Sequence, residues 1–357
     1  MDKALVIPAT FVVGEAFPAN LPLADGSLKP IADCSESEVK QAVDELRSVV
    51  EGSRRLWEPL TVNFRGPTAD ELDDHPNPFL DYRLQVMFRS PDGSTFDVPG
   101  FFDGDGFGGG SGDVWSARFS PDQPGLWTFE ACMHRGEGIA VTLDTGEGKS
   151  VACDGQTGTF EVRSVDDEAP GYWKWGRLEY VDGHYLKFRG GPYWVRGGTD
   201  SPENFLAYEG FDNTPPSHQY AAHRMDWRPG DPDWDGGKGR GIIGAVNYLW
   251  SKRVNSIYML VMNVGGDGGD VWPWVRVIHP EGSPENDNVH FDISKLRQWE
   301  LLFRHAQRKG LFLHFVFNEA EKANKRELDD GELGPERKLY YREIIARFAH
   351  HLALEWN

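Results

Sequence analysis

The C-terminal half of the chain repeats one pattern of apolar and polar positions. Between residues 193 and 357, a short apolar run is followed by acidic and amide residues and then by an amphipathic stretch. Strands that alternate with helices are typical of βαβ units on a parallel sheet. The predicted strands are 193–197, 256–262, 311–317 and 352–357, and the predicted helices are 242–253, 293–309 and 335–350. Because closure needs about eight strands, the pattern predicts an incomplete TIM-type (β/α) barrel.

A different periodicity governs residues 54–165, where apolar and polar side chains alternate in short runs. These runs are 60–64, 82–88, 114–119 and 159–163, with Gly/Pro turns at 90–93 and 121–125. Alternation with a period of two, punctuated by turns, predicts an antiparallel β-sandwich of the Ig-like type. The fold class is therefore a multidomain β plus α/β protein.

The boundaries follow from these patterns. Residues 1–53 form an N-terminal extension with one expected helix, because the capping run 35–38 precedes a helical stripe of Val39, Val43, Leu46, Val49 and Val50. The sandwich occupies 54–165, and a charged break at 166–171 separates it from the half-barrel at 172–357. The half-barrel begins with an expected hairpin at Asp182-Gly183.

Composition narrows the class of partner. The 37 basic and 56 acidic residues give a net charge of −19, which argues against nucleic acid and anionic membranes. Acidity together with 13 Trp, 21 Phe and 11 Tyr suits a carbohydrate ligand. No run approaches the about 18 consecutive apolar residues of a membrane span. The first eight residues are too short for a secretory signal, so the location stays open.

Three cysteines do not make a disulfide framework. Cys132 and Cys153 either pair across a hairpin or remain two separate buried thiols. Cysteine therefore does not identify the cellular compartment.

Polar residues follow each predicted strand of the half-barrel, where barrel enzymes place their chemistry. The candidate substrate-binding residues are Asp200, Glu203, Asn204, Asn263, Asp267, Asp270, Asn318, Glu319, Glu321 and Asn357. The alternative is that they cap turns or lie solvated in loops. Four nearby tryptophans could stack on sugar rings or simply pack in their loops, namely Trp227, Trp234, Trp272 and Trp274.

A glycosidase needs two carboxylates beside the scissile bond, and these cannot be assigned here. Glu355 lies inside the last strand, so a buried, paired, structural carboxylate is the favoured interpretation. His314 is expected to be a satisfied core histidine. Asp103-Gly104-Asp105-Gly106 lacks the glutamate of an EF-hand and predicts a tight turn. His350-His351 lacks a zinc-type partner in sequence, and no metal, nucleotide or cofactor site is predicted.

The β-rich stretch resembles the domain of unknown function 5060 (DUF5060), which precedes glycoside hydrolase-like barrels in bacterial proteins. The likeness rests on Trp57-Glu58-Pro59, Asn77-Pro78-Phe79, Gly100-Phe101-Phe102-Asp103-Gly104-Asp105-Gly106, Trp115-Ser116-Ala117-Arg118-Phe119 and Pro124-Gly125-Leu126-Trp127. Residues 197–206 look like the first strand end of the attached barrel, and 333–343 resemble its third helix.

The resemblance implies a retaining glycoside hydrolase acting on a polysaccharide or oligosaccharide, usually exported. In such barrels, a Trp-Asn run after strand four leads to the acid/base glutamate, and the nucleophile lies on strand seven. Trp356-Asn357 matches the start of that run, so the catalytic residues are expected beyond Asn357 and this chain is expected to be an inactive fragment.

Other interpretations remain open at this point. A complete half-barrel could associate with itself through the open sheet edge at 352–357. A non-catalytic carbohydrate-binding or scaffolding protein is the main alternative function. A lyase or esterase barrel is the third, although the chain has no nucleophile elbow of the G-x-S-x-G type.

Overall fold

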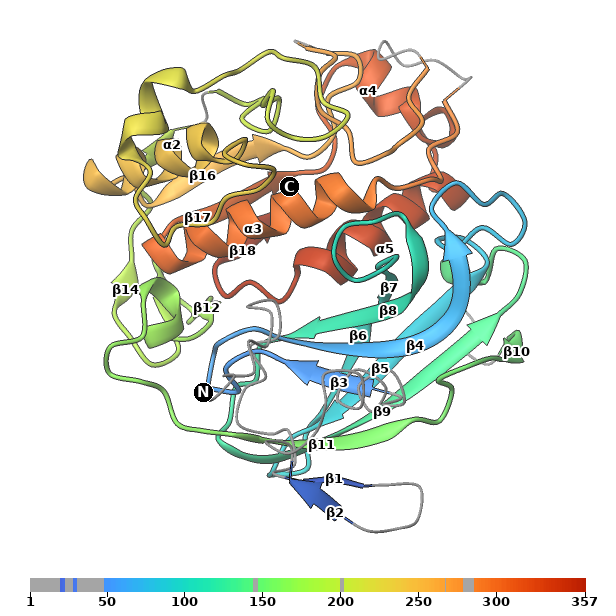
Figure 1. The fold of residues 1–357 in the computed structure, drawn as a ribbon. Coiled ribbons are helices and arrows are strands. Elements are labelled where there is room, and N and C mark those ends of the chain that lie inside the picture. The colour runs from blue at the N-terminus through green and yellow to red at the C-terminus, as the bar shows by residue number, and fades with distance from the viewer. Residues whose placement is uncertain are drawn as a thin grey trace, which may run out of the picture.

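The computed structural model describes residues 20–22, 28–30, 48–143, 147–199, 202–266, 268–278 and 286–357. Two regions of different secondary structure lie against each other (Figure 1). We call residues 48–163 the β-rich part and residues 198–357 the helical part. Within the described residues, no helix has the length and apolar character that a membrane crossing requires.

The β-rich part contains two antiparallel sheets. One has the strand order β3-β4-β8-β7, and the other has the order β10-β9-β5-β6 with β11 also paired to β9. The strands are β3 Ser48–Glu51, β4 Leu60–Asp70, β5 Tyr82–Arg89, β6 Thr95–Pro99, β7 Phe101–Phe102, β8 Ser111–Phe119, β9 Gly125–Arg135, β10 Lys149–Ser150 and β11 Thr157–Val162. Each predicted run overlaps one of them, so the antiparallel β-rich prediction is confirmed.

The core of the β-rich part lies between these two sheets. Along β5 and β9, buried and exposed side chains alternate, as expected for strands with one face on a core. The rings of Phe64 and Phe129, one from each sheet, meet edge to face at 5.8 Å. Phe88 stacks on Phe119 across the same interior at 4.6 Å. Aromatic pairs of this kind therefore join the two sheets.

A small antiparallel sheet connects the two parts. It is formed by β12 Leu178–Glu179, β13 Leu186–Phe188 and β14 Tyr193–Trp194, and the predicted hairpin at Asp182-Gly183 is confirmed. The prediction that residues 193–197 form the first parallel strand is wrong. Tyr193 and Trp194 pair with β13 instead, because the turn at residues 189–190 folds the chain back onto β13, and the parallel sheet is entered only at Gly198.

The helical part is built on a parallel sheet with strands in sequential order. These strands are β15 Gly198–Thr199, β16 Ser256–Leu260, β17 Phe312–Val316 and β18 Leu354–Trp356. The helices of this part are α2 Arg240–Ser251, α3 Ile293–Lys309, α4 Lys322–Glu327 and α5 Pro335–Phe348, with 3-10 turns η4 Ala221–Asp226 and η5 Asp329–Gly331. Two further 3-10 turns lie outside it, η2 Ile139–Val141 in the β-rich part and η3 Gly171–Lys174 between the two parts. The predicted strands 256–262, 311–317 and 352–357 are confirmed with trimmed ends, and the short α4 was not predicted.

Helix α3 shows why some boundaries can be predicted. The Asp292 side chain accepts a hydrogen bond from the Lys295 backbone N–H at 2.9 Å, which caps the helix start. Gly310 ends the helix with φ = 75°, a conformation that glycine adopts without strain. The observed bounds therefore coincide with the predicted range 293–309.

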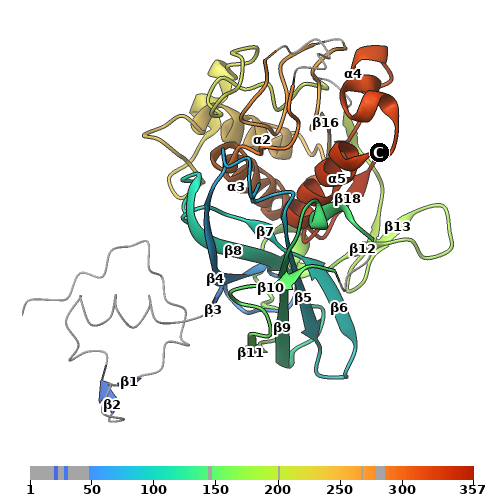
Figure 2. The ribbon, with the colours of Figure 1, turned by 90° about the vertical axis from the view of Figure 1, so that its right-hand side faces the viewer.

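Helices α3 and α5 cover one face of the parallel sheet and separate it from the β-rich part (Figure 2). On the sheet side, the Phe315 ring lies 4.9 Å from Phe303 and 6.2 Å from Phe348. On the other side, two arginines of α5, the half-buried Arg342 and the buried Arg347, donate to backbone carbonyls of the β-rich part. Arg342 donates to Leu84 O at 2.9 Å and Arg347 to Phe102 O at 2.8 Å.

The N-terminal extension is described only in short pieces. Strands β1 Asn20–Pro22 and β2 Leu28–Pro30 pair antiparallel. Val49 and Val50, the last positions of the predicted helical stripe, lie in β3, so the helix prediction is wrong there. They are drawn into the sheet because β3 pairs with β4. Val39, Val43 and Leu46 lie outside the described residues.

Candidate functional site

The carboxyl ends of the parallel strands bring together polar side chains from distant segments. Asn204, which follows β15, donates from Nδ2 to Asp270 Oδ2 at 2.8 Å. Its Oδ1 lies 2.7 Å from His218 Nε2, so that ring nitrogen carries the proton and donates. The result is a directional chain from His218 through Asn204 to Asp270. Two predicted residues, Asn204 and Asp270, therefore meet, and sequence reasoning missed His218.

The loop after β16, which carries Asp270, adds Asn263 to this cluster. Asn263 and Asp270 close the loop through backbone hydrogen bonds, with Asp270 N–H donating to Asn263 O at 3.0 Å. Both side chains are buried, with exposures of 1% and 8%. Asn263 Oδ1 and Asp270 Oδ1 have no hydrogen-bond partner among the described residues. Buried oxygens of this kind are suited to accept hydrogen bonds from a ligand.

Tyr220 lies close enough to this cluster for the charge of Asp270 to affect its pKa. Burial raises the pKa of the Tyr220 phenol, and the nearby Asp270 carboxylate raises it further. The hydroxyl therefore stays protonated and donates to Phe205 O at 3.1 Å. Tyr220 supports the segment around Asn204 and does not act as a base.

A carboxylate after β17 lies next to the same loop. Glu319 is 8% exposed, and its Oε2 accepts from Asn324 Nδ2 at 2.8 Å. Asn324 Oδ1 in turn accepts from the Val264 N–H at 3.0 Å, which connects the segments after β16 and β17. Near it, Glu321 Oε2 is buried and has no partner within the described part of the chain.

The absence of a side chain at Gly266 lets the Glu319 carboxylate lie against the loop that follows β16. A Cβ at position 266 would overlap Glu319 Oε2, so Gly266→Ala must push the carboxylate away from Asn324. We expect the free energy of unfolding to fall by about 1–3 kcal/mol, since a buried polar group loses its partner. Urea unfolding followed by tryptophan fluorescence measures the change. Gly183→Ala is the matched control because a Cβ there meets nothing within 4 Å; equal stability of both variants would contradict the prediction.

Other predicted residues have partners elsewhere or lie outside the described residues. Asn318 donates to Tyr341 Oη and accepts from Arg337 Nη1, both at 2.8 Å, so its amide is used by α5. Asn357 continues the β18 ladder through hydrogen bonds with Phe315 and Phe317. Glu203 is half-buried beside the cluster, and its carbonyl accepts from Leu260 N–H. Asp200 and Asp267 lie outside the described residues.

A separate polar row runs across the face of the sheet that is opposite to α3 and α5. His314 Nε2 lies 3.1 Å from Glu355 Oε1 and 3.2 Å from Asn357 Nδ2, and Arg196, which lies between β14 and β15, approaches Glu355 to 3.8 Å. Burial lowers the pKa of His314, and this outweighs the opposing effect of Glu355. His314 is buried with partners, as expected. Glu355 is paired as predicted, but its side chain is 43% exposed, so the prediction of burial is wrong.

The tryptophan side chains of this region pack against protein groups and are buried or half-buried. Trp234, Trp272 and Trp274 are buried, with exposures of 9% or less. Trp234 stacks on Phe211 and donates to Gly210 O at 2.7 Å. Trp227 is covered by the Arg240 guanidinium at 4.5 Å. Stacking of a sugar on these rings is therefore not supported by their positions, and loop packing is the interpretation that the structure favours.

A cavity of about 570 Å³ opens at the opposite end of the parallel sheet, near Asn255 and Gly310. Its walls are aromatic and cationic, from Trp175, Trp194, Trp250, Lys174, Arg308 and Lys309. Among the residues that the structure describes, no carboxylate lines it. Because sheets of parallel strands with helical crossovers place their ligand sites at the carboxyl ends of the strands, we place the candidate site there and not in this cavity.

Comparison with known proteins supports parts of this picture. Residues 53–134 match the family model named Domain of unknown function (DUF5060), which confirms the resemblance for most of the β-rich part. The match ends before the helical part. A comparison with curated proteins gave no match.

Among solved structures, the chain is similar to a "putative glycoside hydrolase" from Bacteroides vulgatus ATCC 8482. The TM-score is 0.56 at 17% identity, over 85% of this chain and 48% of that one. The chain therefore spans about half the length of that protein, and the likeness concerns the fold alone. Pullulanases from Bacillus subtilis (TM-score 0.16, 12% identity, 77% and 33% covered) and Paenibacillus barengoltzii (0.19, 13%, 88% and 48%) are too distant to carry an argument.

Proposed function

We propose that this chain is the N-terminal part of a retaining glycoside hydrolase that acts on a polysaccharide or oligosaccharide. In this proposal, residues 54–165 form an Ig-like sandwich and residues 172–357 form the first half of a (β/α)8 barrel. The sequential order of four parallel strands and the fold shared with the Bacteroides vulgatus protein support it. That the chain spans 48% of that protein is consistent with a further half beyond it.

The observation that carries the proposal is the polar cluster at the strand ends. Asn204, Asn263 and Asp270 converge there, and two of their buried oxygens lack partners among the described residues. A sugar hydroxyl both donates and accepts hydrogen bonds, so a pair of amides and a carboxylate can bind adjacent hydroxyls. Glu319 lies against the same loop and adds a negative charge to this edge of the sheet.

The catalytic carboxylates are proposed to lie beyond Asn357. A retaining enzyme holds its acid/base and nucleophile about 5–5.5 Å apart at the strand ends. Asp270 and Glu319 are already hydrogen-bonded to Asn204 and Asn324, which suits residues that orient a substrate. The chain alone is therefore expected to bind a glycan without cleaving it.

Sugar binding by this chain tests the proposal. We expect one glycan from a panel of α-glucans, β-glucans, xylans and pectins to bind, and Asp270→Asn to weaken its binding at least about tenfold, since a charge-assisted hydrogen bond is lost. Isothermal titration calorimetry measures the affinity. Glu209→Gln is the matched control because its exposed carboxylate lies in the same loop region.

The outcomes separate the alternatives. If no glycan binds, or if both variants bind equally, the proposed site is wrong. Binding by this chain, together with hydrolysis by the protein isolated from its native source, supports the glycosidase proposal. Binding without hydrolysis by any longer form favours a carbohydrate-binding or scaffolding protein instead.

A further inference from the structure

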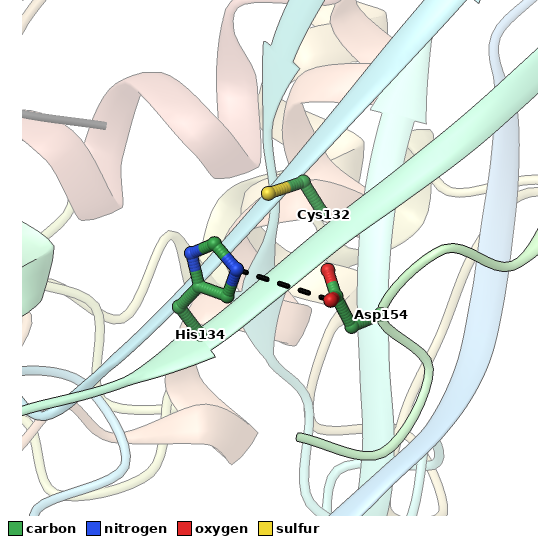
Figure 3. Close-up of side chains that lie close together, drawn as sticks. All are labelled: Cys132, His134 and Asp154. Carbon is green, nitrogen blue, oxygen red and sulfur yellow. Dashed lines mark ion pairs between the residues drawn. The ribbon is translucent and has the colours of Figure 1, made fainter. Parts of the chain in front are cut away.

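Three potential metal ligands of different types gather on the outer surface of the β-rich part. Cys132 and His134 come from β9, and Asp154 comes from the turn that follows β10 (Figure 3). Their ligand atoms, one thiol sulfur, one ring nitrogen and one carboxylate oxygen, all lie within 4.8 Å of one another. The His134 ring and the Asp154 carboxylate face each other at 3.8 Å. The group is far in sequence and structure from the candidate glycan site.

The strand geometry explains why two of these side chains share one face. Residues i and i+2 of a strand point to the same side, so Cys132 and His134 stand together on the outer face. The alternate positions Ala131 and Met133 are buried at 1% exposure or less. The pair is therefore presented to solvent by a strand whose other face is fixed in the core.

The third ligand is held in place by independent contacts. Asp154 Oδ1 accepts from the Met133 N–H at 2.8 Å, and Asp154 Oδ2 accepts from Ser150 Oγ at 2.5 Å. Cys153 precedes it with φ = 70°, a left-handed conformation that turns the chain toward β9. Hydrogen bonds that orient a metal ligand in this way are a regular feature of metal sites.

The donor set matches a divalent transition metal. Thiolate, imidazole and carboxylate are all zinc ligands, and in a tetrahedron their donor atoms lie about 3.3–3.8 Å apart. The donor atoms of this group all lie within 4.8 Å of one another, so the observed spacing is already close to the one that a bound ion requires. A thiolate and a carboxylate together neutralise a dication. His134 and Asp154 are 20% and 23% exposed and Cys132 is exposed, so an ion can enter and a water can complete its coordination.

The neighbouring groups leave the thiol available for a metal. Cys132 and Cys153 are both free, which supports two separate thiols, although Cys132 is exposed and the prediction that it is buried is wrong. Cys153 is turned away, with Sγ 3.3 Å from Met133 Sδ, and burial raises its pKa to about 12. The charged groups nearest Cys132 besides Asp154 are Arg83 and Asp97, and the Arg83 guanidinium donates to Thr142 O.

The same surroundings argue against a reactive thiolate. Partial loss of solvent around the Cys132 thiol raises its pKa, and the charge of Asp154 and the hydrogen bond to it raise the pKa further. A nucleophilic cysteine needs the opposite, a thiolate stabilised by a cation or a helix N-terminus. A metal ion supplies that stabilisation itself, because it replaces the thiol proton.

We propose that Cys132, His134 and Asp154 form a binding site for one divalent transition-metal ion of the Zn²⁺ type. The ion takes Sγ, one imidazole nitrogen and one carboxylate oxygen, and it leaves one position to water. It ties the turn at residues 151–156 to β9 and so stabilises the outer edge of the β-rich part. The sequence predicted no metal here, because Asp154 lies twenty positions beyond the Cys-x-His pair.

Titration with Co²⁺ tests the site directly, because a cysteine thiolate bound to Co²⁺ gives an ultraviolet charge-transfer band. We expect the full chain to bind one Co²⁺ with that band, and Zn²⁺ to displace it. Cys132→Ser and Asp154→Asn should weaken binding at least about a hundredfold, since each removes a ligand. His184→Ala is the matched control because His184 is exposed in the turn between β12 and β13.

The readouts distinguish the site from other thiols and from loss of folding. Circular dichroism checks that Cys132→Ser keeps its secondary structure, and Zn²⁺ should raise the thermal midpoint of the full chain and not that of this variant. The proposal is overturned if the full chain shows no thiolate band at millimolar Co²⁺. It is also overturned if the band survives Cys132→Ser and disappears in Cys34→Ser or Cys153→Ser.

Discussion

Replacing Glu300 with alanine is expected to lower the free energy of unfolding by about 3–5 kcal/mol, because it breaks a buried charge cluster. Glu300 of α3 lies 3.1 Å from both His350 Nε2 and His351 Nε2, and Arg118 of β8 lies 3.9 Å away. All four side chains are buried or nearly so. Without the carboxylate, two imidazoles lose their common partner and the guanidinium of Arg118 loses its counter-charge.

Urea unfolding followed by fluorescence and circular dichroism measures this effect. Glu332→Ala serves as the control. Glu332 is exposed, so loss of its side chain should change the free energy of unfolding by no more than about 0.5 kcal/mol. If Glu300→Ala unfolds at the same urea concentration as Glu332→Ala, the cluster contributes nothing to stability and the argument from burial is wrong. This cluster could not be predicted from the sequence, because Glu300 lies fifty positions before His350 and belongs to a different helix.

The second large effect is a loss of stability in mild acid. Burial lowers the pKa of His350 to about 4, more than the neighbouring Glu300 raises it, whereas an unfolded histidine titrates near 6.5. The unfolded state therefore binds a proton first, and the folded state loses stability as the pH falls from 6.5 toward 4. This one group contributes about 2–3 kcal/mol of that loss by pH 4.5. The lowered pKa of Glu300 acts in the same direction below about pH 4.5.

His350→Asn isolates the contribution of this histidine. The variant should be less stable at pH 7, but its free energy of unfolding should fall by about 2–3 kcal/mol less between pH 7 and pH 4.5. Some pH dependence should remain, because burial also lowers the pKa of His305 to about 4. Parallel slopes for the full chain and the variant, measured by urea unfolding at several pH values, would exclude His350 as the titrating group.

Local signals explain why much of the fold could be predicted. Helix α3 has an Asp292 cap, a Gly310 stop and an apolar stripe between them, and its bounds were predicted without error. Alternation along β5 and β9 was equally clear. Predictions failed where the choice of a neighbouring strand determines the structure of a segment. Residues 193–194 are apolar enough for a parallel strand, yet they join β13 because the neighbouring hairpin offers a closer partner.

The candidate site could be predicted as a region but not as a set of contacts. The rule that polar groups gather at carboxyl strand ends predicted Asn204 and Asp270 on one edge of the sheet, and the structure joins them by a hydrogen bond. It could not show that Asn318 turns toward α5, since Arg337 and Tyr341 reach it only after the helix packs. Likewise, His218 lies fourteen residues from Asn204 in an irregular loop, where no periodicity indicates the direction of a side chain.

The hydrogen bonds donated by the arginines of α5 affect how freely the sequences of the β-rich part and of this helix can change during evolution. Arg342 and Arg347 donate to the carbonyl oxygens of Leu84 and Phe102, which are main-chain groups that every residue type supplies. Sequence drift at the acceptor positions therefore leaves these bonds intact, whereas loss of either arginine abolishes one at once. The tolerance to mutation is unequal on the two sides of the contact. A β-rich part of different sequence could be grafted onto this helix more readily than the helix could be exchanged beneath the β-rich part.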